Sequence, residues 1–191
     1  MARLQAIHYA RELLKNETLI LDTETTGVER SEIIQIAIID KNGTTLLDTF
    51  VKPVNLIPAS ATRIHGITNA EVQDAPSWMD VAPEVEKILR QHQHLLVYNA
   101  IFDRKMMHTS AEWCGAPVRD WKTYIQWVCA MMLYSEYHGE SNLRGGYRWQ
   151  SLEKACTRFS VNGGYRAHSA IGDCYRTLEV IKGMAATEFP E

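Results

Sequence analysis

Three short segments of this sequence place carboxylates at spacings that could hold divalent cations. The first is Asp22-Thr23-Glu24, which follows the apolar run Leu19–Leu21. Residues two apart on a strand point to the same face, so the two carboxylates would repel each other. Mg²⁺ or Mn²⁺ would relieve this repulsion, because these hard cations prefer oxygen ligands. Taken alone, the motif also fits a polar strand end without any metal.

The other two segments are expected at helix starts. They are Asn99-Ala100-Ile101-Phe102-Asp103 and His168-Ser169-Ala170-Ile171-Gly172-Asp173. Asn99 could cap the first of these helices, and Asp103 would favour the positive end of its dipole. Asp103 would also face the end of the first strand, where it could reach a second cation. His168 is expected at the beginning of its helix and to be more mobile than Asp173. Capping alone would explain either segment singly.

In this order the motifs read L-D-x-E-T-T-G, N-A-x-F-D and H-x-A-x-x-D. They resemble the DEDD family of 3′→5′ exonucleases, in the branch with a histidine five residues before the last aspartate. That branch includes the epsilon proofreading subunit of bacterial DNA polymerase III, ribonuclease T and oligoribonuclease. The resemblance covers roughly residues 18–183. It extends to Ile33–Ala37 and to Ile64–Thr68, whereas Tyr98 stands where the family commonly has histidine.

The resemblance implies a ribonuclease H-like α/β fold. Such a fold has a central mixed sheet, a three-strand antiparallel meander plus parallel strands, flanked by helices. The apolar patterns independently predict this layered α/β arrangement. Strands are expected at 19–22, 32–40, 44–51 and 95–98, with a weaker strand at 117–121. Helices are expected at 2–15, 59–64, 69–72, 81–91, 101–114, 122–137, 149–159 and 168–184.

The resemblance also implies two-metal phosphodiester hydrolysis with two Mg²⁺ or Mn²⁺ ions. Asp22 would contact both ions, Glu24 and Asp173 would complete the first, and Asp103 would help to hold the second. His168 would take the proton from the attacking water. The 3′-terminal nucleotide is expected to contact Thr25, Thr26, Gly27, His65, Asn99 and Phe102. Packing within a helix or loop is the alternative role for Phe102 and His65.

A second candidate contact surface lies in residues 141–166, where five basic residues alternate with aromatic ones. Stacking and backbone neutralisation could bind a single strand there. A solvated helix face with buried aromatics is the alternative. The basic residues are Arg144, Arg148, Lys154, Arg158 and Arg166, and Tyr147, Trp149 and Tyr165 are interleaved with them.

Length and composition agree with one globular domain. The 191 residues carry a net charge of −3 and include no membrane-spanning run or signal peptide, so a cytoplasmic location is expected. Residues 1–17 would form a helical extension of a single exonuclease domain spanning 1–191. The expected substrate is DNA with a single-stranded or frayed 3′ end. The alternatives are an exoribonuclease or oligoribonuclease, a catalytically inactive nucleic-acid-binding module, and an accessory subunit of a polymerase or other DNA-processing complex. Oligomeric state is left open.

Overall fold

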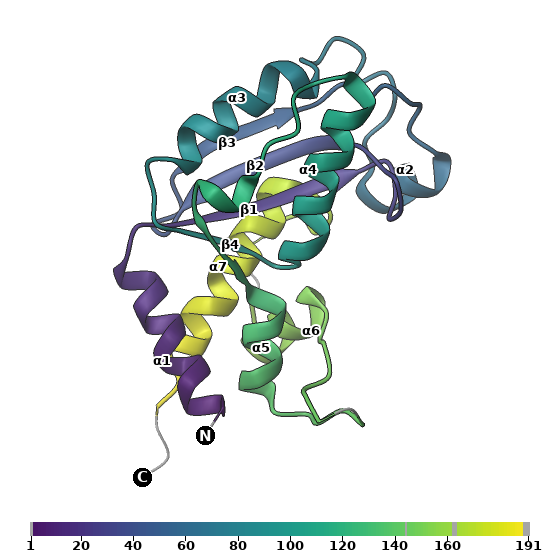
Figure 1. Cartoon of the computed structure of the whole chain (residues 1–191). Coiled ribbons are helices and arrows are strands. Elements are labelled where there is room, and N and C mark those ends of the chain that lie inside the picture. Colours follow the sequence, from purple (N-terminus) through teal and green to yellow (C-terminus); the bar gives the residue numbers. More distant parts are fainter. Residues whose placement is uncertain (1, 144, 162–163, 189–191) are drawn as a thin grey trace.

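The centre of the molecule is a five-stranded sheet with the strand order β3-β2-β1-β4-β5. The computed structural model describes residues 2–143, 145–161 and 164–188. The meander is antiparallel, and the two remaining strands run parallel to the first of its strands (Figure 1). The predicted mixed sheet is therefore confirmed. Its strands are β1 (Thr18–Thr25), β2 (Ile33–Asp40), β3 (Thr45–Phe50), β4 (His94–Val97) and β5 (Gln126–Cys129).

Alternate residues of the central strands face two separate hydrophobic cores. Ile20 and Leu96 belong to one core, whereas Leu19, Leu21 and Leu95 belong to the other. The strand pleat produces this alternation, because successive side chains point to opposite faces. Both faces of β1 and β2 are covered, which explains why these strands read as continuous apolar runs in the sequence.

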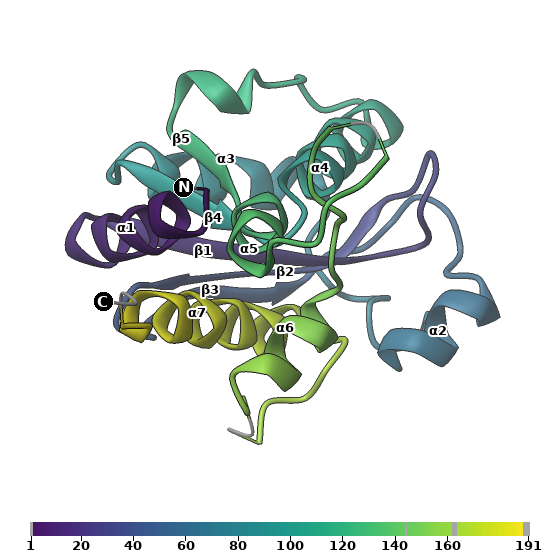
Figure 2. The ribbon, with the colours of Figure 1, turned by 90° about the horizontal axis from the view of Figure 1, so that it is seen from below.

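Helices form the outer layers on both faces of the sheet. Figure 2 shows α3 (Trp78–Leu89) and α4 (Ala100–Cys114) on one side, and α6 (Leu152–Arg158) and α7 (Ala170–Ala186) on the other. α7 packs on β1 and β2. The start of α7 and the start of α4 therefore approach the end of β1 from opposite faces.

The N-terminal helix is built into this core. α1 (Ala2–Lys15) packs against α5 (Ala130–His138) and α7, and its buried residues belong to the same core as Ile20. Residues 1–17 were predicted to form a helical extension of the domain. In the structure, α1 packs on the hydrophobic core of the domain itself. α2 (Ala59–His65) lies beyond the end of β1 (Figure 1). None of the helices that the structure describes is both long and apolar enough to span a bilayer.

The largest difference from the predicted elements lies in residues 122–137, which were expected to form one helix. They instead contribute to a short 3₁₀ helix, η1 (Trp121–Thr123), and form β5 and α5. The spacing of Trp121, Tyr124 and Val128 fits a helix, but pairing with β4 fixes the segment around Val128 as a strand. Burial of all three against the cores agrees with the predicted packing role.

Smaller differences concern element ends. Residues 69–72 form turns rather than a helix, and residues 117–120 have no regular structure. The last two helices begin at Leu152 and Ala170, later than the apolar periodicity predicted. In both, a serine occupies the N-cap and its side chain accepts a backbone N–H, which fixes the start of the helix.

Candidate active site

Asp22 and Glu24 lie on the face of β1 that packs against α7. Ile20 belongs to the core that includes α7 residues, and the strand alternation gives the same orientation to the two carboxylates. α7 supplies Asp173 from its first turn. One carboxylate oxygen from each of these three residues lies within 4.8 Å of the others. The strand end and the last helix thus bring three of the four predicted carboxylates together.

The fourth carboxylate, Asp103, approaches from α4 on the opposite face. It is 2% exposed, and its Oδ1 accepts a hydrogen bond from Thr23 Oγ1 at 2.7 Å. Thr23 lies between Asp22 and Glu24 on β1 and points to the other side of the sheet. Its hydroxyl therefore fixes Asp103 against the strand that carries Asp22.

Burial raises the pKa values of Asp22, Glu24 and Asp103, and repulsion between carboxylates adds to the rise at Asp22 and Glu24. Burial raises the pKa of Asp22 well above its ordinary value, and the neighbouring carboxylates raise it further. The pKa of Glu24 rises to about 8, chiefly through burial and then through repulsion by Asp173 and Asp103. Burial raises the pKa of Asp103 to about 7, although the hydrogen bond from Thr23 opposes this rise. The cluster is therefore costly to ionise unless a cation compensates its charge.

His168 lies two residues before α7, in a turn rather than at the helix start that was predicted. Its φ is 57°, in the left-handed region that most residues avoid. The backbone N–H of His168 donates to Asp173 Oδ2 at 3.3 Å, and the residue is exposed. The turn therefore ties the main chain of His168 to Asp173 and leaves the imidazole at the surface beside the cluster.

Two glycines allow the chain segments around this turn to pack closely. A side chain at Gly172 would overlap the carbonyl oxygen of Arg166, so the glycine allows the two backbone segments to approach closely. A side chain at Gly66, which has φ of 81°, would overlap the Arg166 guanidinium. Arg166 Nη2 donates to the His65 carbonyl at 3.1 Å. Arg166 thus joins the turn that carries His168 to the end of α2.

A cavity of about 390 Å³ adjoins the cluster. His65 is 3% exposed; its Nδ1 accepts from the Ile67 N–H at 3.0 Å, and its Nε2 has no protein hydrogen-bond partner within the described residues. Phe102 lines the cavity and also packs against the core, so its position is compatible with both the substrate contact and the packing role considered for it. The lining residues are Thr23, Glu24, Thr25, Thr26, Gly27, Val28, Ser60, Ala61, Ile64, His65 and Phe102.

Asn99 is outside this cavity lining. It occupies the N-cap position of α4, but its side chain makes no capping hydrogen bond. Its backbone carbonyl instead accepts the N–H groups of Phe102 and Asp103 at 2.9 and 3.2 Å. Asn99 therefore orients the first turn of α4 through its main chain.

Sequence reasoning missed two residues that hold the cluster. Gln35 is buried on β2; its Oε1 accepts the Ala170 N–H at 3.2 Å, which fixes the start of α7. Arg176 is buried one turn after Asp173 and donates to Asp173 Oδ1 at 2.8 Å. The i,i+3 spacing of Asp173 and Arg176 was the only sequence signal, and such pairs usually lie on helix surfaces.

The donor set fits hard divalent cations. All four groups are carboxylates, which Mg²⁺ and Mn²⁺ prefer, and the raised pKa values of Asp22, Glu24 and Asp103 show that burying their charges is unfavourable without added positive charge. Asp22, Glu24 and Asp173 could hold one ion. Asp22 and Asp103 could hold a second, on the side of α4.

Comparison with known proteins gives the family. The family model described as "Exonuclease", RNase T, matches residues 19–181. An uncharacterised exonuclease, CP81 of Escherichia phage 186, is 37% identical over 179 residues, which is 92% of each chain. The DNA polymerase III subunit epsilon of Escherichia coli is 25% identical, over 87% of this chain and 70% of its own.

Solved structures show the same fold. Exonuclease X in complex with 5′ overhanging duplex DNA matches with a TM-score of 0.66 and 26% identity, over 91% of this chain and 94% of its own. E. coli exonuclease I bound to a dA16 oligonucleotide matches with a TM-score of 0.69 over 87% of this chain and 41% of its own; at 18% identity this shows the fold alone. The fold is thus ribonuclease H-like, and the chain belongs to the RNase T family of 3′→5′ exonucleases, in the DEDD branch with an active-site histidine that its motifs indicate.

Proposed function

We propose that this protein removes nucleoside 5′-monophosphates from single-stranded or frayed 3′ ends of DNA, using two Mg²⁺ or Mn²⁺ ions. One observation carries the proposal. A carboxylate cluster suited to divalent cations adjoins an open cavity of about 390 Å³ whose lining includes Thr25, Thr26 and Gly27. That volume is in the range of small-molecule sites and would hold a terminal nucleotide. The whole chain, residues 1–191, would act as one exonuclease domain.

The four carboxylates of the cluster and His168 have separate roles in this proposal. Asp22 would hold both ions, Glu24 and Asp173 the first, and Asp103 the second. When bound, two divalent cations supply an activated water and stabilise the leaving oxygen. His168 would accept the proton of the attacking water, because its main chain is tied to Asp173, its side chain is exposed, and a positioned imidazole is an effective base near neutral pH.

The cavity would bind the 3′-terminal nucleotide. The Thr25, Thr26 and Gly27 backbone would contact the 3′-hydroxyl and the sugar. Phe102 would stack against the terminal base, which tolerates any sequence. His65 would line the nucleotide pocket through its ring, because its Nε2 is itself buried in the structure. Asn99 would contribute by orienting Phe102 and Asp103 rather than by touching the base.

DNA is favoured over RNA as the substrate because several similar proteins are named for DNA or were solved with it. Several are epsilon subunits of DNA polymerase III, and exonuclease X was solved with duplex DNA. The second candidate substrate is RNA, because the same chemistry cleaves either polymer and only recognition of the 2′-hydroxyl separates them. An accessory role within a polymerase or another DNA-processing complex is compatible with either substrate.

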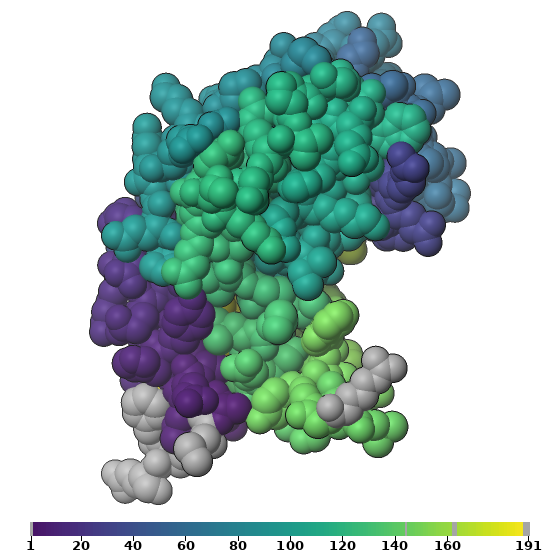
Figure 3. Space-filling model, in the orientation of Figure 1, coloured from purple at the N-terminus to yellow at the C-terminus, as the bar shows by residue number. Residues whose placement is uncertain are grey.

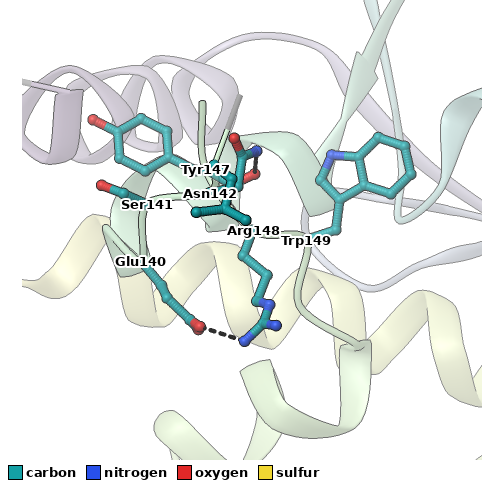
Figure 4. Close-up of a pocket in the computed structure, with 7 residues that line it drawn as sticks. Glu140, Ser141, Asn142, Tyr147, Arg148 and Trp149 are labelled. Carbon is teal, nitrogen blue, oxygen red and sulfur yellow. Dashed lines mark hydrogen bonds and ion pairs between the residues drawn. The ribbon is translucent and has the colours of Figure 1, made fainter. Parts of the chain in front are cut away.

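The rest of the bound strand, on the 5′ side of the cleaved nucleotide, would run from the site through a hollow between α4 and α6 (Figure 3). The arm between α5 and α6, of which the structure describes residues 139–143 and 145–151, lies below this hollow. Trp149 in the arm is 65% exposed. Figure 4 shows its indole pointing away from Glu140 and Tyr147, whereas the neighbouring Arg148 pairs with Glu140. Trp149 would stack on a base of the leaving strand.

The basic residues predicted to neutralise that strand contribute unequally. Arg148 is paired with Glu140, and Arg166 donates to the His65 carbonyl. Of the aromatic residues, Tyr165 is already stacked on Tyr175, with ring centroids 4.9 Å apart. Lys154 and Arg158 on α6 are exposed. Arg144 lies outside the described residues. The exposed pair on α6 would therefore supply the backbone contacts.

Digestion of matched DNA and RNA oligonucleotides tests the proposed substrate. Each oligonucleotide carries the same sequence with a 5′ label, and hydrolysis is measured with Mg²⁺ and then Mn²⁺. The DNA strand should shorten at least tenfold faster than the RNA strand. Equal rates, or faster RNA hydrolysis, would replace the DNA proposal by the ribonuclease alternative.

A further inference from the structure

Arg176 joins the carboxylate cluster to α6. Nη1 donates to Asp173 Oδ1 at 2.8 Å, and Nη2 donates to the Glu153 carboxylate. The Arg176 side chain is 10% exposed, whereas that of Glu153 is 74% exposed. A long cationic side chain is seldom this buried unless it is paired. The guanidinium therefore occupies a fixed place between the last helix, α7, and α6.

The contact with Arg176 determines how Asp173 can act as a ligand. Arg176 binds Oδ1 and the His168 N–H binds Oδ2 at 3.3 Å, so both oxygens are held by one donor each. A carboxylate oxygen has two acceptor positions, which leaves one on each oxygen for a cation. Without Arg176, Asp173 would be free to turn away from the repelling charges of Asp22 and Glu24.

Glu153 holds the other end of the guanidinium. Arg176 is attracted towards Asp22, whose pKa it lowers against the rise caused by burial. A guanidinium drawn further in would occupy the space that a cation needs. By binding Nη2 from α6, Glu153 restrains Arg176 on the outer side of Asp173. The planar fork of arginine can bind two carboxylates in this way, and the single ammonium of lysine cannot do so in the same geometry.

We propose that Arg176 is a positioning residue that holds Asp173 in the orientation required to bind a divalent cation. The inference rests on the proposed metal-dependent function and adds a residue to it. Partners that orient metal ligands commonly change metal affinity by about 10- to 100-fold when they are removed. The Arg176→Met variant, which keeps most of the side-chain volume without the donors, should therefore bind the first Mn²⁺ about 10- to 100-fold more weakly.

Direct Mn²⁺ binding to the metal-free protein, followed by electron paramagnetic resonance, measures this effect without turnover. A role of Arg176 as a positive charge alone predicts the opposite sign, because removing a nearby cation would strengthen Mn²⁺ binding. Unchanged or tighter binding by folded Arg176→Met would thus overturn the proposal. Arg119→Met is the matched control, because Arg119 is also partly buried and paired, with Glu86 at 2.8 Å. This control should bind Mn²⁺ as the wild type does.

A second variant keeps the test decisive if Arg176→Met does not fold. Arg176→Lys retains the charge but cannot hold Asp173 and Glu153 together, so it should weaken Mn²⁺ binding by at least threefold. Wild-type binding by folded Arg176→Lys would also overturn the proposal. In nuclease assays, both variants should need more Mn²⁺ for half-maximal rate at an unchanged oligonucleotide KM. Absence of nuclease activity in the wild type would reject the proposed function, and the binding measurement would still report on Arg176.

Discussion

Replacing Asp103 by asparagine should stabilise the metal-free protein while abolishing its activity. Asparagine has nearly the same shape, and its Oδ1 can still accept the hydrogen bond from Thr23. The substitution removes a charge from a site that is 2% exposed. Stability and activity should therefore change in opposite directions, as expected for a ligand whose charge is unfavourable without its metal.

The size of the effect follows from the pKa of Asp103, which rises from an ordinary value of 3.8 to about 7. A carboxyl group with a raised pKa in the folded state destabilises that state once pH exceeds the unfolded value, and the cost stops growing above the folded value. At about 1.4 kcal/mol for each tenfold change, the full cost at pH 8 is about 4 kcal/mol. Because Asp22 shares the site, we expect a gain of about 2 to 4 kcal/mol for Asp103→Asn at pH 8, and about 1 kcal/mol at pH 5.

Thermal unfolding in EDTA at pH 5 and pH 8 checks this prediction. At about 3 °C for each kcal/mol, the Tm at pH 8 should rise by roughly 6 to 12 °C. The exposed Asp74→Asn variant serves as the control and should change stability by less than about 0.5 kcal/mol. If Asp103→Asn instead lowers the Tm at pH 8, then Asp103 is a structural acceptor and the repulsion argument is wrong. Added Mn²⁺ should stabilise the wild type more than the variant.

Three further outcomes are expected. EDTA should abolish hydrolysis, and Mg²⁺ or Mn²⁺ should restore it; full activity in metal-free buffer would contradict the role of the cluster. The His168→Ala variant should lower kcat by about 10²- to 10⁴-fold with an unchanged Mn²⁺ requirement, and a rate within a few-fold of wild type would assign the proton transfer to another group. Trp149→Ala should raise the KM for a long single strand by about 5- to 100-fold, the worth of one stacked base, and leave the KM for a dinucleotide unchanged. Equal effects on both substrates would place Trp149 outside the path of the leaving strand.

Local patterns were sufficient to predict the part of the fold that carries β1 to β3. The apolar run before Asp22 and the Asn42-Gly43 turn are determined by neighbouring residues, so the meander could be read directly. β5 could not, because four residues with helix-compatible spacing become a strand only by pairing with β4. Its existence depends on tertiary contacts that no local pattern records.

The four carboxylates and His168 could be proposed as the active site from the sequence because their motifs have fixed order and spacing. Their surroundings were less accessible. The left-handed backbone of His168 follows from the Ser169 cap and from the packing of Gly172 against Arg166, which the helical periodicity does not reveal. The i,i+3 spacing of Asp173 and Arg176 does not reveal that the pair is buried, because the burial of Arg176 depends on the docking of α6 through Glu153.

The most direct test of the account is the time course of a 5′-labelled single-stranded DNA digested with Mg²⁺. The wild type should produce a ladder of labelled strands that shorten by one nucleotide at a time, together with unlabelled 5′-monophosphates. A 3′-phosphate on the same strand should block the reaction, and Asp22→Asn should abolish it. Immediate release of the label as a mononucleotide, rapid cutting of a circular strand, or undiminished activity of Asp22→Asn would contradict the claim that this carboxylate cluster removes nucleotides from a bound 3′ end.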